Sequence, residues 1–125
     1  MTVAEKKRML LEKAGEGYGF EDLITVVEVL RSEEGCRWDR EQDNKSIRRD
    51  FIEETYEVIE AIDTENPELL REELGDVLLQ VTFHAQIETE IGRFTIEDVA
   101  NDICVKLIHR HPHAFGDVKA DTSEK

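Results

Sequence analysis

Two pairs of acidic residues in this 125-residue chain have the spacing of a metal site. Glu54 and Glu57 form the first pair, and Glu73 and Asp76 form the second. Residues three positions apart lie on the same side of a helix, so two adjacent antiparallel helices would bring the pairs face to face. Such an oxygen-only cage suits a hard cation, and Mg²⁺ in particular is held by a few carboxylates while it keeps positions for water and substrate phosphates.

Helical periodicity distinguishes the second pair from the other acids of the chain. Apolar residues surround the helix predicted over 67–91 almost completely, as expected for a largely buried helix in the middle of a bundle. Glu73 and Asp76 fall inside that apolar surface. Since a buried, unpaired carboxylate is costly, it protonates, pairs with a cation or binds a metal. Three other acids of this helix are expected to be ordinary solvated side chains: Glu72, Glu88 and Glu90.

The acids of the preceding predicted helix, which starts around Ser46, leave two interpretations open. Glu54 lies at the border of the apolar arc, Glu57 lies on the polar side, and Glu53 lies nearly opposite the arc. For Glu53 and Glu57 alone, a solvated face or salt bridges to neighbouring arginines is the simpler interpretation. A di-iron carboxylate site is disfavoured, because no histidine has an acidic residue three positions before it. The apolar arc itself comprises Ile47, Phe51, Ile52, Tyr56, Val58, Ile59 and Ile62.

Helical spacing accounts for the whole chain, which is predicted to be an all-α bundle of four to five helices. Only two prolines occur, and apolar residues never alternate over the length of a strand. Residues 1–19 are expected to form an N-terminal extension, either a short basic helix or a loose arm, that ends in a glycine-rich joint. Residues 20–125 are expected to form one helical domain, with helices at 20–34, 46–62, 67–91 and 95–111.

The composition excludes several classes of protein. The 30 Asp and Glu residues against 16 Lys and Arg give a formal charge of -14, which argues against binding to a nucleic acid polymer or an anionic membrane. No segment approaches the roughly 18 apolar residues of a membrane span, and no apolar stretch follows the N-terminal basic residues. Cys36 and Cys104 lack the spacing of a disulfide scaffold or a zinc site, so reduced thiols in a cytoplasmic protein are expected.

Four blocks of the sequence match, in order, the pattern of one known family. Residues 53–57 and 73–76 fit the pattern Glu-Glu-x-x-Glu followed by Glu-x-x-Asp. Residues 35–42 are similar to a Gly-Cys-Pro-Trp-Asp-x-x-Gln loop, with Arg37 in place of the usual proline. Residues 106–117 are similar to a Lys-Leu-x-x-Arg-His-Pro-His-Val-Phe segment. From about residue 20 to 123, the chain therefore resembles the MazG-type all-α nucleoside triphosphate pyrophosphohydrolases.

This resemblance implies that the protein hydrolyses nucleoside triphosphates to the monophosphate and pyrophosphate, with Mg²⁺ or Mn²⁺ as cofactor. It implies that Glu53 helps to bind a second ion or orients water. The implied metal ligands are Glu54, Glu57, Glu73 and Asp76, which together with Glu53 form the expected catalytic set. The expected substrate contacts are Trp38 and Asp39 for the base, and Lys106, Arg110 and His111 for the phosphates.

Several of these residues have a structural alternative. Trp38 stacks on a base or caps the bundle as a hydrophobic plug. His111 contacts phosphate or closes the end of its helix, and His84 is expected to be a hydrogen-bonded core residue.

A second class of function stays open, namely a non-catalytic MazG-like nucleotide-binding or dimerisation module that keeps the metal cage without turnover. Metal-dependent release of pyrophosphate separates the two. A homodimer is expected in either case, because a helix that is apolar nearly all round leaves apolar surface to cover in so short a bundle.

Overall fold

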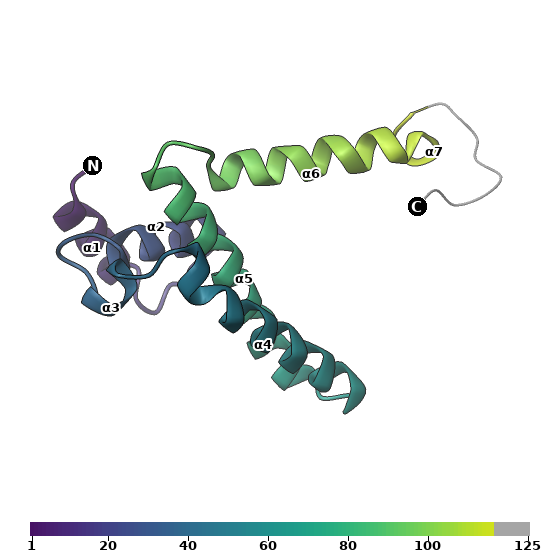
Figure 1. Cartoon of the computed structure of the whole chain (residues 1–125), viewed down its shortest axis with the longest axis horizontal. Coiled ribbons are helices and arrows are strands. Elements are labelled where there is room, and N and C mark those ends of the chain that lie inside the picture. Colours follow the sequence, from purple (N-terminus) through teal and green to yellow (C-terminus); the bar gives the residue numbers. More distant parts are fainter. Residues whose placement is uncertain (117–125) are drawn as a thin grey trace.

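The chain folds entirely into helices and turns over residues 1–116, the part that this computed structural model describes (Figure 1). The all-α prediction is confirmed. The stretch of the predicted domain beyond residue 116 lies outside the described residues. No described helix is both long and apolar enough to cross a membrane. The helices are α1 (Val3–Glu12), α2 (Phe20–Leu30), α3 (Arg37–Arg40), α4 (Asn44–Asp63), α5 (Pro67–Glu90), α6 (Ile96–Arg110) and α7 (Pro112–Phe115).

The α4–α5 hairpin is the largest helix pair of the fold (Figure 1). As predicted, α5 begins at Pro67 with Asn66 as its N-cap, because the Asn66 side chain accepts the backbone N–H of Leu69 at 3.1 Å. Helix α4 begins two residues before the predicted Ser46. The reason is Asp43, whose carboxylate accepts the Ser46 backbone N–H at 2.8 Å and thereby caps the helix.

A small apolar core lies where α2 packs against one end of this hairpin. Val27 of α2 is fully buried beside Ile47 of α4 and Phe83 and Ile87 of α5. The predicted apolar arc of α4 is therefore split, since Ile47 is buried whereas Ile52 and Ile59 are exposed. The expectation that the helix over 67–91 is largely buried holds for the half of α5 beside α2 but not for the half that carries Leu74 and Leu78, which are exposed.

Helix α1 is an integral part of the fold, which rules out the loose-arm interpretation of residues 1–19. It packs on α2 and buries Leu10. Lys13 pairs with Asp22 at 2.7 Å, and the Tyr18 hydroxyl donates to the Leu10 carbonyl at 2.8 Å. The predicted joint bends at Gly15, whose φ of 86° is in the left-handed region.

Helix α6 projects away from the α4–α5 hairpin (Figure 1). Among the described elements it contacts only α5 and α7, and none of its residues is buried. The helices of one chain therefore do not close around α6, and its apolar stripe faces solvent. That stripe comprises Val99, Ile103 and Leu107.

We expect Leu10→Ala to lower the free energy of unfolding by about 2–3 kcal/mol, because it leaves a cavity between α1 and α2. Leu11→Ala is the matched control, since Leu11 follows Leu10 in the same helix but is 75% exposed, and it should change stability by less than about 0.5 kcal/mol. Urea unfolding followed by circular dichroism measures both. Equal stabilities of the two variants would show that α1 does not pack as described.

Candidate functional site

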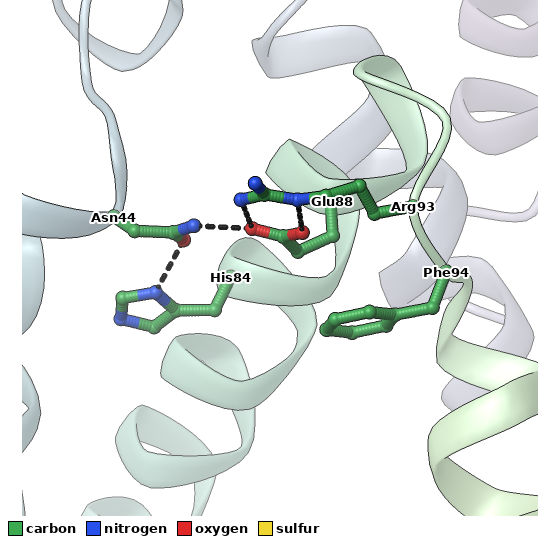
Figure 2. Close-up of a pocket in the computed structure, with 5 residues that line it drawn as sticks. All are labelled: Asn44, His84, Glu88, Arg93 and Phe94. Atoms are coloured by element: carbon green, nitrogen blue, oxygen red, sulfur yellow. Dashed lines mark hydrogen bonds and ion pairs between the residues drawn. The ribbon is translucent and has the colours of Figure 1, made fainter.

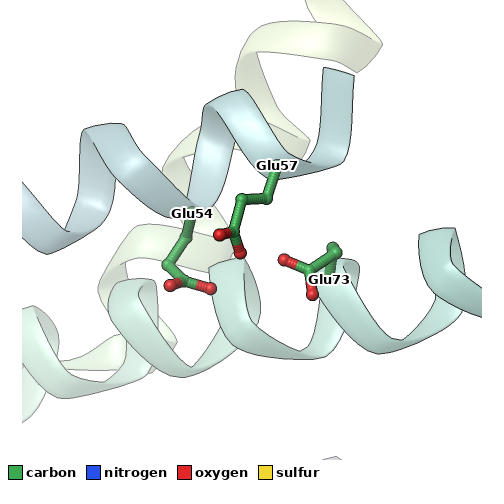
Figure 3. A group of neighbouring side chains, drawn as sticks. All are labelled: Glu54, Glu57 and Glu73. Atoms are coloured by element: carbon green, nitrogen blue, oxygen red, sulfur yellow. The ribbon is translucent and has the colours of Figure 1, made fainter. Parts of the chain in front are cut away.

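An acidic cluster crosses the α4–α5 interface. One carboxylate oxygen from each of Glu54, Glu57 and Glu73 lies within 4.8 Å of the other two (Figure 3). Glu73 is only 6% exposed, as its place in the apolar surface of α5 predicted. Glu54 is half-buried and Glu57 is exposed. The prediction that α4 and α5 bring these acids together is confirmed.

Because these acids lie close together, the pKa values of Glu73 and Glu54 are raised. The pKa of Glu73 is raised to about 7, first by a hydrogen bond that its protonated carboxyl makes with Glu57, then by burial and by the repulsion of the neighbouring acids. The pKa of Glu54 is also raised, first by burial and then by a hydrogen bond with Asp76. Asp76, which is half-buried, therefore belongs to the cluster through Glu54.

The cluster has the chemistry of a site for a hard cation. The Oε2 atoms of Glu54 and Glu73 are buried and have no hydrogen-bond partner in the described part of the chain. Each unpartnered carboxylate oxygen carries a desolvation cost that a cation would remove. Since every donor is a carboxylate oxygen, the set fits Mg²⁺ or Mn²⁺.

Glu53 does not join this cluster. It lies on the outer face of α4, where it borders a shallow pocket with Arg48, Arg49, Ile52 and Tyr56. Its predicted role with a second ion or a water molecule is not supported by its position within this chain.

Trp38 and Asp39 lie on the short helix α3, and Trp38 is 59% exposed. Trp38 therefore does not plug the core, which leaves its side chain free to contact a ligand. Arg31 fixes the position of this segment, because its Nη1 donates to the carbonyls of Asp39 and Gln42 at 2.7 and 2.9 Å. The same guanidinium forms a two-pronged ion pair with Glu90 of α5.

The predicted phosphate contacts are not near the acidic cluster within one chain. Lys106 and Arg110 lie on α6, which makes no contact with α4 in the described structure. His111 follows α6, and its Nδ1 lies 2.7 Å from the Leu107 carbonyl oxygen. That contact agrees with the alternative in which His111 closes the helix end.

A polar network that the sequence did not predict lies at the other end of the hairpin (Figure 2). Glu88 was expected to be solvated, and this expectation is wrong, since Glu88 is 6% exposed and pairs with Arg93. Asn44 donates to Glu88 and lies 2.8 Å from Nδ1 of His84. His84 is thus the hydrogen-bonded residue that was predicted. The sequence did offer one sign of this network, because His84 and Glu88 are four residues apart and so lie on the same side of a helix.

Comparison with known proteins identifies the fold family. The MazG nucleotide pyrophosphohydrolase domain matches residues 42–115. The chain is 59% identical over 101 residues to the nucleoside triphosphate pyrophosphohydrolase/pyrophosphatase MazG of Thermotoga maritima, a match that covers 81% of this chain and 40% of that protein.

Two further relatives carry a similar name. The nucleoside triphosphate pyrophosphohydrolase of Escherichia coli is 47% identical over 104 residues, covering 82% of this chain and 40% of that protein. The Mycobacterium tuberculosis protein of that name is 43% identical over 93 residues, covering 73% and 28%. The chain therefore spans well under half the length of these curated relatives.

The raised pKa of Glu73 predicts how the metal-free protein responds to pH. Because the folded state holds this proton more tightly than the unfolded state, with a pKa of about 7 against 4.5, the contribution of Glu73 to stability is lost as the pH rises from 4.5 through 7. In a chelator, the melting temperature should therefore fall over this range. Mg²⁺ added at pH 8 should restore it, because the ion replaces the proton.

Glu73→Gln should flatten this pH dependence and abolish the effect of Mg²⁺. Glu72→Gln is the matched control, because Glu72 is the exposed neighbour on the same helix, and it should behave like the unmodified protein. Thermal melts of the three proteins at pH 5.5 to 8 measure the effect. Parallel curves for the unmodified protein and Glu73→Gln would contradict the assignment.

Proposed function

Since this chain belongs to the MazG nucleotide pyrophosphohydrolase family, we propose that it hydrolyses nucleoside triphosphates to the monophosphate and pyrophosphate. The observation that carries this proposal is the acidic cluster of Glu54, Glu57 and Glu73, with a buried carboxylate whose pKa is raised to about 7. A stability role alone would not explain acids held at this distance, because their mutual repulsion opposes folding.

We assign the binding of Mg²⁺, or of Mn²⁺ in its place, to Glu54, Glu57, Glu73 and Asp76. When bound, such an ion offsets the negative charge of the polyphosphate and lowers the pKa of a bound water. To act as a ligand, Glu73 would have to lose the proton that its raised pKa favours. The hairpin holds these side chains in place before substrate arrives, so little reorganisation is required.

Substrate contacts are proposed on either side of this centre. Trp38 and Asp39 are proposed to contact the nucleoside, and the exposure of Trp38 supports this. Lys106 and Arg110 are proposed to bind phosphate, with His111 beside them. Positive charge placed against the polyphosphate is the main requirement of phosphoryl transfer.

We propose that a homodimer brings α6 of one chain near the acidic cluster of the other. In residues 1–116, apolar stripes on α6 and on the outer face of α4 face solvent. The second stripe comprises Ile52, Tyr56 and Ile59, which are 60%, 68% and 47% exposed. Contiguous apolar surface of this kind is typical of an interface between subunits. We therefore propose a homodimer. We also propose a cytoplasmic location, in which both free cysteines are reduced.

The activity is tested by measuring pyrophosphate release from a panel of ribo- and deoxyribonucleoside triphosphates with Mg²⁺. We expect release with the monophosphate as co-product. Glu73→Gln and Asp76→Asn should each lower the rate by roughly 100-fold or more, because even residues behind metal ligands are commonly worth 10–100-fold. Glu72→Gln again serves as the control and should retain the rate.

Absence of release from every nucleotide, by a folded protein that binds Mg²⁺, would refute the catalytic proposal. That result would favour a binding or dimerisation module.

The dimer is tested by light scattering at micromolar concentration, where we expect twice the chain mass of 14.5 kDa. Ile103→Glu should yield a monomer, because it places a charge in the apolar stripe of α6. Asn101→Glu adds the same charge at another exposed position of α6 and should leave the dimer intact. A monomeric unmodified protein would contradict the proposal.

A further inference from the structure

A pocket of about 500 Å³ lies at the opposite end of the hairpin from the acidic cluster. It is lined by Asn44 at the start of α4, by His84 and Glu88 of α5, and by Arg93 and Phe94 of the turn that leads to α6 (Figure 2). Its volume is in the range of small-molecule sites. None of the roles assigned above to the metal centre or to the phosphate contacts uses these five residues.

The hydrogen bonds of this network fix the direction of each amide and ring proton. Two N–H groups of Arg93 donate to Glu88, and this ion pair is the main reason why the pKa of Glu88 lies below its ordinary value. Glu88 is therefore a carboxylate that only accepts, so the amide nitrogen of Asn44 must face it. The Asn44 oxygen then faces His84, whose Nδ1 must carry the proton.

The hydrogen bonds to Glu88 and His84 fix which way the Asn44 amide faces in the pocket. An asparagine amide has two N–H donors and two acceptor lone pairs. Glu88 uses one donor and His84 uses one lone pair, so one of each remains. A side chain that offers a donor next to an acceptor is well suited to the edge of a nucleobase. Phe94, which is 42% exposed, supplies an aromatic surface for stacking.

The pocket is placed at a suitable distance from the acidic cluster. Asp76, Gln80 and His84 follow one another at intervals of four on α5, so they lie along the same side of that helix. The eight residues from Asp76 to His84 correspond to about 12 Å at 1.5 Å per residue. An extended nucleotide can span such a distance between its phosphates and its base.

The segment that carries Trp38 leads directly into this pocket. Gln42, whose carbonyl oxygen accepts from Arg31, is separated from Asn44 by Asp43 alone. Arg31 ties that segment to Glu90, two residues beyond Glu88 on α5. The exposed tryptophan and the pocket thus belong to the same end of the hairpin.

We propose that the pocket lined by Asn44, His84, Glu88, Arg93 and Phe94 receives the nucleobase of the nucleotide. Phe94 stacks on the base and Asn44 hydrogen-bonds to its edge, while Arg93, Glu88 and His84 hold the Asn44 amide in place. The proposal rests on the proposed function, because it assumes that the polyphosphate lies at the acidic cluster.

The test compares two ligands by equilibrium binding in Mg²⁺, namely α,β-methylene-ATP and inorganic tripolyphosphate. The second ligand has the phosphates but no nucleoside. Asn44→Ser and Phe94→Leu should each weaken binding of the ATP analogue about 10-fold, as expected for one lost base contact. Neither should change tripolyphosphate binding by more than about 2-fold. Phe20→Leu is the matched control, because Phe20 is 45% exposed but does not line the pocket.

Three results would overturn the inference, and each is distinct. Unchanged affinity of both pocket variants for the ATP analogue would place the base elsewhere and leave the proposed function intact. Equal weakening of both ligands would show that the network only supports the fold. If the unmodified protein binds neither ligand and releases no pyrophosphate, the proposed function itself fails.

Discussion

Glu54, Glu57 and Glu73 repel one another across the α4–α5 interface, and one of them is buried. This repulsion would separate the two helices unless contacts elsewhere held them together. The apolar core of Val27, Ile47, Phe83 and Ile87 supplies those contacts at the other end of the hairpin. Ala61, on the turn side of the acids, is buried as well, so packing on both sides of the acidic cluster offsets the cost of like charges.

Two ion pairs, each with one buried side chain, reinforce the end of the hairpin beside the apolar core. Arg31 has a side chain that is 7% exposed, and its guanidinium lies 5.3 Å from the centre of the Phe83 ring while it bonds to Glu90 and to two carbonyl oxygens. Glu88 connects α4 to the turn before α6 in a similar way, because it accepts hydrogen bonds from Asn44 and from Arg93. Because buried charges require fully formed partners, these contacts specify how the segments after α2 and α5 meet the hairpin. A rigid scaffold of this kind is what a metal centre on the hairpin needs.

In a single chain, no other described helix covers the outer face of α4 or the apolar stripe of α6. The outer face of α4 and the whole of α6 carry exposed apolar side chains, and the basic residues Lys106 and Arg110 stand on that same isolated helix. Within residues 1–116, Glu54, Glu57, Glu73 and Asp76 form no ion pair with a basic side chain. The proposed homodimer is the arrangement in which a second copy covers these apolar side chains and places Lys106 and Arg110 near the acids, and it links the proposed oligomer to the proposed chemistry.

The sequence by itself determined helices α2, α4, α5 and α6, the Asn66 cap of α5 and the burial of one acid. Periodicity shows how a residue is oriented around its own helix, so it identified Glu73 as an inward-facing carboxylate, and the Asn66 cap fixed the start of α5. Periodicity does not show which neighbour covers each face. Only the tertiary structure could therefore show that Glu88 is buried by Arg93 and Asn44, and that α6 stands apart. These outcomes depend on contacts between residues that are distant along the chain. A local sequence pattern carries no information on the energy of such contacts.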